Sequence, residues 1–189
     1  GNSDNGSNAG HVRIYENNGG SWTQIGQDID GEAPIDYSGS SVSLSSDGNT
    51  VAIGAYGNDG NGTDAGHVRI YENTSGSWTQ ICQDIDGEAA YDYSSISVSL
   101  SSDGNKVAIG AYSNDGNGTN AGHVRIYENT SGTWTQIGQD LDGEAAGDES
   151  GVSVSLSSDG NTVAIGGIYN HGNGISSGHV RIYENTGGS

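Results

Sequence analysis

The stretch GHVRIYEN at Gly10–Asn17 decides the fold, because the chain repeats it three times more at a constant spacing. The later copies begin at Gly66, Gly122 and Gly178, each 56 residues after the one before. A strict period of this order is the signature of a repeat architecture, in which every unit packs mainly on its neighbours. The sequence therefore predicts a repeat scaffold rather than an ordinary single-core domain.

The period divides the chain of 189 residues into five parts. Residues 1–9 are too polar to pack and are expected to form a flexible lead. Three complete repeats occupy residues 10–65, 66–121 and 122–177. Residues 178–189 begin a fourth repeat and are expected to act as a closing or exchanged strand.

Alternation of apolar residues with small or polar ones predicts four short antiparallel strands in each repeat. In the first repeat these are His11–Glu16, Ser21–Gly26, Ser41–Ser45 and Thr50–Ala55. The Asp-Gly pair at 47–48 favours a tight hairpin between the last two, because such a turn needs residues that tolerate a positive φ.

The strands at 41–45 and 50–55 carry large apolar residues on one face and only Ser, Ala and Gly on the other. A solvent-facing surface would more often carry Lys, Glu and Thr, whereas a face of small residues lets a second sheet pack closely. We therefore predict an all-β fold of propeller-like blades, three of them plus a partial fourth. An open solenoid of stacked sheets is the alternative.

Composition and charge restrict the partners. Five basic residues stand against 24 acidic ones, for a net charge of −19, so the chain offers no surface that would neutralise phosphates. We expect no nucleic-acid partner and no membrane insertion. Cys82 is the only cysteine and the other repeats have Gly26 and Gly138 in its place, so no disulfide forms within the chain.

The run from Tyr37 to Tyr71 reads YSGSSVSLSSDGNTVAIGAYGNDGNGTDAGHVRIY. It resembles the FG-GAP repeat of integrin α-subunit propellers, and still more the repeats of large secreted or cell-surface proteins of aquatic microbes. The resemblance implies a β-propeller with an extracellular or cell-surface location. Phe is absent, however, and the family's calcium loop is reduced to Ser-Asp-Gly-Asn at 46–49, which is too short to wrap a cation.

Two other acidic segments are candidate calcium sites, because Ca²⁺ takes six to eight oxygen ligands. The segment NDGNGTD at 58–64 loses its carboxylates in the third repeat, which makes it the weaker candidate. The segment QDIDGEA keeps its three carboxylates in every repeat, and solvated loops are the alternative interpretation. Its candidate ligands are Asp28, Asp30, Glu32, Asp84, Asp86, Glu88, Asp140, Asp142 and Glu144.

Five Asn-X-Ser/Thr sequons fall in predicted loops and are candidate glycosylation sites, provided that the source organism glycosylates. They are Asn5, Asn61, Asn73, Asn117 and Asn129.

The repeated histidines stand in one sequence context, His-Val-Arg-Ile-Tyr, which predicts one structural role in every copy rather than a single metal ligand or catalytic base. Only a few residues occur in one repeat alone and could form an active site that the other repeats lack, and no catalytic motif occurs among them. They are Pro34, Cys82, Lys106, Glu149 and His171. On this basis the chain is expected not to be an enzyme.

The strand order leaves the last blade without its fourth strand and the N-terminus with a spare hairpin. Incomplete units with complementary ends assemble head to tail, as rings or filaments, and a neighbouring chain could complete a blade. We therefore expect a non-enzymatic extracellular structural or adhesion module that self-associates. The alternative is a calcium-assisted propeller that binds a carbohydrate or protein.

Overall fold

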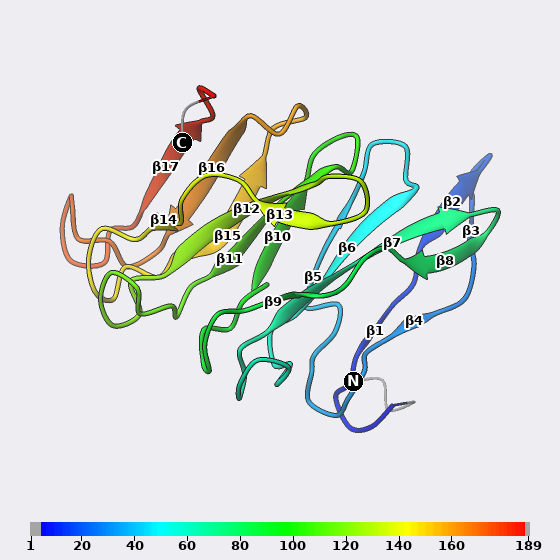
Figure 1. Cartoon of the computed structure of the whole chain (residues 1–189), viewed down its shortest axis with the longest axis horizontal. Coiled ribbons are helices and arrows are strands. Elements are labelled where there is room, and N and C mark those ends of the chain that lie inside the picture. Colours follow the sequence, from blue (N-terminus) through cyan, green and yellow to red (C-terminus); the bar gives the residue numbers. More distant parts are fainter. Residues whose placement is uncertain (1–4, 188–189) are drawn as a thin grey trace.

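The computed structural model describes residues 5–187 as a row of antiparallel sheets that fan out one after another along the chain (Figure 1). This confirms the predicted all-β, propeller-like fold. The first and last sheets lie at opposite ends of the row, and the sheets do not close into a ring (Figure 1). Within residues 5–187 no helix is long and apolar enough to span a membrane.

The first sheet of the row consists of two separate two-stranded pairs. Strand β1 (His11–Val12) pairs with β4 (Ile29–Asp30), and β2 (Tyr15–Asn18) pairs with β3 (Ser21–Gln24). The second sheet has the order β5 (Ser41–Leu44), β6 (Thr50–Ala55), β7 (His67–Thr74) and β8 (Ser77–Gln80), with β9 (Ile85–Asp86) on the first part of β7.

The third sheet has the same plan, with β10 (Ser97–Leu100), β11 (Lys106–Ala111), β12 (His123–Asn129), β13 (Trp134–Gln136) and β14 (Leu141–Asp142). The fourth contains β15 (Ser150–Leu156), β16 (Thr162–Gly167) and β17 (His179–Glu184). The second, third and fourth sheets therefore take their first two strands from one repeat and the remainder from the next, whereas β1–β4 all belong to the first repeat.

The core lies in the seams between successive sheets. Val68 and Ile70 of the second sheet pack against Val98 and Leu100 of the third, and Ala52 is fully buried in the same cluster. The predicted small-residue face therefore packs against a neighbouring sheet. Its serines also join the sheets, because the Ser43 hydroxyl accepts a hydrogen bond from the Leu100 N–H at 2.9 Å.

The same kind of surface is left uncovered in β5 of the second sheet and in β17 of the last sheet. Val42 is 53% exposed, whereas its equivalent Val98 in the next repeat is 9% exposed. In the last sheet Val180 is 67% exposed, whereas its equivalent Val124 is fully buried. Since the residue types are identical, the difference comes from whether strands of a neighbouring sheet cover the residue.

Candidate functional site

Each seam between sheets contains a cluster of charged and polar side chains. In β7, His67 and Arg69 lie on one face because alternate residues of a strand point the same way. His67 Nδ1 is 3.5 Å from Asp84 Oδ2, and Arg69 Nη1 is 3.6 Å from Glu32 Oε1. Glu32 belongs to the preceding repeat, so two successive repeats build the cluster.

The next seam reproduces this cluster one repeat later. His123 Nδ1 lies 3.7 Å from Asp140 Oδ2 and 3.9 Å from Glu88 Oε2. Arg125 binds the other carboxylate oxygens: its Nε is 3.2 Å from Asp140 Oδ1, and its guanidinium also pairs with Glu88 Oε1. The guanidinium thus takes one oxygen of each carboxylate and leaves the second oxygen facing the imidazole.

Burial keeps these imidazoles neutral. His67 and His123 are only 1% and 3% exposed, and desolvation lowers the pKa of each, against the nearby carboxylates that raise it. His123 Nδ1 is buried and makes no hydrogen bond. The carboxylates reach the surface, because the side chains of Glu32 and Glu88 are 46% and 43% exposed.

At the two ends of the row the cluster is incomplete in the described residues. Arg13 pairs with Asp28 at 2.7 Å on the surface, and this pairing and a hydrogen bond from Gln24 lower the pKa of Asp28 to about 2. At the last seam Glu144 lies 3.8 Å from His179 and 3.7 Å from Arg181. These pairs are more exposed because no further sheet covers them.

In two of the repeats the Arg of the strand also packs against the Tyr two residues later. The guanidinium carbon of Arg69 lies 5.6 Å from the ring centre of Tyr71, and Arg181 lies 5.7 Å from that of Tyr183. The histidines, however, face carboxylates rather than aromatic rings, which the sequence context did not indicate.

The three candidate calcium ligands of one QDIDGEA segment do not converge on a common point. The first Asp of the QDIDGEA segment joins the Arg of its own repeat in two copies, as Asp28 and Asp140 do, whereas Asp84 faces His67. The Glu joins the His–Arg pair of the following repeat, as Glu32 does with Arg69. The second Asp lies in the short strand beside the His, as Asp86 pairs with His67 in backbone register. Calcium binding stays a prediction.

The ligand atoms that do converge come from Glu32, His67 and Asp84 and, one repeat later, from Glu88, His123 and Asp140. Within each set the atoms lie within 4.8 Å of one another. Because each set contains an imidazole nitrogen, it suits zinc or a similar metal better than calcium. The guanidinium already supplies positive charge to the same carboxylates, which reduces the attraction for any cation.

The candidate glycosylation residues take part in turns or in bonds between loops. The side-chain amides of Asn5, Asn61 and Asn117 donate to backbone carbonyls 26 residues further along the chain. Asn73 and Asn129 accept turn hydrogen bonds from Gly76 and Gly132 through their side-chain oxygens. Glycosylation stays a prediction.

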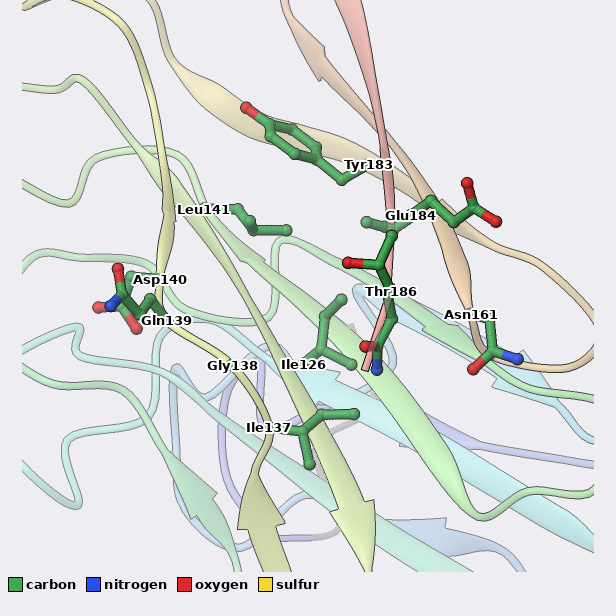
Figure 2. A pocket seen from close by; sticks show the side chains of 13 residues that line it. Ile126, Ile137, Gly138, Gln139, Asp140, Leu141, Asn161, Tyr183, Glu184 and Thr186 are labelled. Carbon is green, nitrogen blue, oxygen red and sulfur yellow. The ribbon is translucent and has the colours of Figure 1, made fainter. Parts of the chain in front are cut away.

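A cavity of about 330 Å³ lies at the last seam, between β12, β14 and β17 (Figure 2). Ile126, Ile137 and Leu141 form much of its apolar wall, and Tyr183 faces it from β17 (Figure 2). Asp140 belongs both to this wall and to the His123–Arg125 cluster.

Comparison with known families supports the sequence resemblance. Residues 29–71 match the FG-GAP repeat family, from β4 to Tyr71 in β7. The chain therefore carries an FG-GAP repeat. No curated protein matches the chain by sequence.

Several solved structures share the fold at low sequence identity. A putative 6-phosphogluconolactonase from Bacteroides uniformis matches 93% of this chain and 44% of its own, at 12% identity and a TM-score of 0.61. A putative 6-phosphogluconolactonase from Bacteroides fragilis matches 80% of this chain and 36% of its own, at 16% identity and a TM-score of 0.52.

The periplasmic gluconolactonase of Pseudomonas aeruginosa matches 91% of this chain and 45% of its own, at 18% identity and a TM-score of 0.51. This chain thus spans less than half the length of each of these structures.

These comparisons overturn the prediction of a non-enzymatic structural or adhesion module. Self-association stays a prediction. Lactonases, which are enzymes, share the fold, so near-identical sheets do not indicate the absence of chemistry. The expectation that the chain is not an enzyme was wrong: it rested on the lack of one asymmetric set of catalytic residues, and the fold shared with lactonases contradicts it. The clusters are symmetric and lie between repeats.

Proposed function

We propose that this chain supplies sheets to a β-propeller hydrolase that opens the cyclic ester of a sugar acid. The observation that carries the proposal is the seam cluster around His123, where a buried imidazole nitrogen without a hydrogen bond faces two carboxylates and a guanidinium. The likeness to lactonases in fold supports this substrate class. The proposal concerns both complete clusters.

The cluster has the groups that hydrolysis requires. His123 Nδ1 lies 3.7 and 3.9 Å from the two carboxylate oxygens, which is too long for direct hydrogen bonds, and the proposal places a water among the three groups. A neutral imidazole can take a proton from that water, as a general base does. Arg125 carries positive charge at the same point, where it can stabilise a developing oxyanion.

The proposed reaction conserves atoms and protons. The water oxygen bonds to the ester carbon as the imidazole accepts a proton, and the bond between that carbon and the ring oxygen then breaks. The imidazole returns its proton to the ring oxygen, which leaves an open hydroxy acid. No redox partner is needed.

The charge of the chain favours a neutral substrate. Each complete cluster has two carboxylates for one guanidinium, and the whole chain has a net charge of −19. A phosphorylated lactone would be repelled by this field. We therefore expect gluconolactone to be hydrolysed faster than 6-phosphogluconolactone.

The test is lactone hydrolysis followed by titration of the released acid at constant pH, corrected for the spontaneous rate. The double variant His67→Gln, His123→Gln should lose at least about a hundredfold of the catalysed rate, the usual contribution of a general base. Ser131→Gly, in the exposed turn after β12, serves as the matched control and should keep the full rate.

An unchanged rate in the double variant, with a native circular dichroism spectrum, would contradict the proposal. So would a wild-type rate no greater than that of buffer alone.

The proposal includes a location outside the cytoplasm, either secreted or periplasmic. The FG-GAP repeat at 29–71 and the likeness in fold to a periplasmic gluconolactonase support it.

A further inference from the structure

At the first seam, a tryptophan of the second sheet packs against the first sheet. Trp78 of β8 is 4% exposed and its indole N–H donates to the Ile25 carbonyl at 2.9 Å. The side-chain amide of Gln27 donates to the Trp78 carbonyl at 2.9 Å. A Cβ on Gly26 would lie 2.7 Å from the indole Cδ1, so the missing side chain makes room for the ring.

The last seam has the same set of residues that surrounds the indole at the first seam, but no tryptophan of the described residues occupies it. The equivalents of Ile25, Gly26 and Gln27 two repeats later are Ile137, Gly138 and Gln139, and all three line the cavity of about 330 Å³. Nothing lies within 4 Å of the place where a Gly138 Cβ would be. Figure 2 shows Ile137 and Ile126 close to one another among the residues that line this space.

The strand beside the cavity has the matching free edge. In the second sheet β7 pairs with β6 on one side and with β8 and β9 on the other. Among the described residues β17 pairs with β16 alone. The register of Asn73 with Trp78 places a corresponding tryptophan opposite Asn185, which lines the cavity.

We propose that this groove is a docking site for one extended strand of the repeat's own Ser-Trp-Thr-Gln type. The strand adds to the free edge of β17, and its indole fills the cavity. By analogy with the first seam, its indole N–H donates to the Ile137 carbonyl and the Gln139 amide donates to its backbone. Main-chain pairing supplies affinity and the indole pocket supplies specificity, as in other cases of strand addition.

The test uses a fluorescein-labelled peptide with the sequence of residues 19–27, GGSWTQIGQ, added to the chain and followed by fluorescence anisotropy. The peptide should bind saturably, and replacement of its Trp by Ala should weaken binding at least tenfold. The chain variant Gly138→Asn, which tolerates the positive φ of 75° but fills the slot, should weaken the Trp peptide by a similar factor.

A second measurement tests the proposal even if the free peptide binds too weakly to reach saturation. The sequence Trp-Thr-Gln-Ile-Gly is fused after Ser189, and a matched fusion carries Ala in place of Trp. The Trp fusion should melt at a higher temperature than the Ala fusion. Equal melting temperatures, or peptide binding that ignores both the Trp→Ala and Gly138→Asn changes, would overturn the proposal.

Discussion

At the scale of single residues, Cys82 shows how one side chain loosens a seam. It occupies the position of Gly26 and Gly138 and adopts φ 69°, a conformation that costs a residue with a Cβ about 1–2 kcal/mol. Trp134, which packs at this seam, leaves its buried indole nitrogen without a hydrogen bond, whereas Trp78 above Gly26 makes one. We attribute the difference to the added side chain beneath the ring.

We therefore predict that Cys82→Gly stabilises the chain by about 1 kcal/mol. Glycine adopts the positive φ without steric cost, and its missing side chain lets the Trp134 indole pack and hydrogen-bond as Trp78 does. Urea denaturation under reducing conditions measures the change. Cys82→Ser retains the Cβ and should give no gain. A Gly variant no more stable than the Ser variant would argue against this account.

A second effect at this scale concerns the Ser-Asp-Gly-Asn turns. The Asp103 carboxylate accepts from the Ser101 hydroxyl at 2.6 Å and the Asn105 N–H at 3.0 Å, and these bonds lower its pKa from 3.8. A lowered carboxyl pKa contributes stability that is present above the unfolded value and is lost as the pH falls through the folded value.

Asp103→Ala should accordingly cost about 1 kcal/mol at pH 7, the typical contribution of such hydrogen bonds. The difference from wild type should shrink below pH 4, when the wild-type carboxyl takes up its proton. Chemical denaturation at pH 7 and at pH 3 measures both values. A penalty that stays constant between the two would show that the charge is not responsible.

At the scale of strands, the small-residue faces determine how closely sheets approach. Ala108 of β11 is fully buried against Leu156, Val163 and Ile165 of the fourth sheet. Its equivalent in β16, Ala164, is only partly buried because no described sheet covers that face. The same residue in the same kind of strand thus has two environments.

Ala108→Val should destabilise the chain by about 1–3 kcal/mol, because the added methyl groups have no space between the sheets. Ala164→Val is the matched control and should be neutral or slightly favourable, since Val suits a strand and meets no neighbour. Thermal unfolding of the two variants decides the matter. Equal destabilisation would mean that sheet spacing is not what the small residues control.

At the scale of the whole molecule, the chain is a row of similar sheets whose stability is shared between neighbours. The third sheet packs between the second and the fourth, whereas Val42 of the second sheet and Val180 of the last are interior-type residues that stay exposed. The same seams that hold the sheets together also bring Glu, His and Asp into one place. Stability and the candidate chemistry therefore depend on the same contacts.

The period, the strands, the antiparallel order and the propeller-like class could all be predicted from the amino-acid sequence. These are local properties: alternation fixes the strand faces, and turn residues such as Asp47-Gly48 fix the hairpins. The FG-GAP resemblance followed from the same local pattern and is confirmed at 29–71.

Which polar residues meet, in contrast, depends on how the sheets pack. Glu32 and His67 stand 35 residues apart in the chain, and nothing in either segment shows that they face one another across a seam. Packing likewise buries Val124 and leaves Val180 exposed, although both occur in HVRIYE. Local sequence sets the faces of a strand, but the packing of a neighbouring sheet sets what those faces touch.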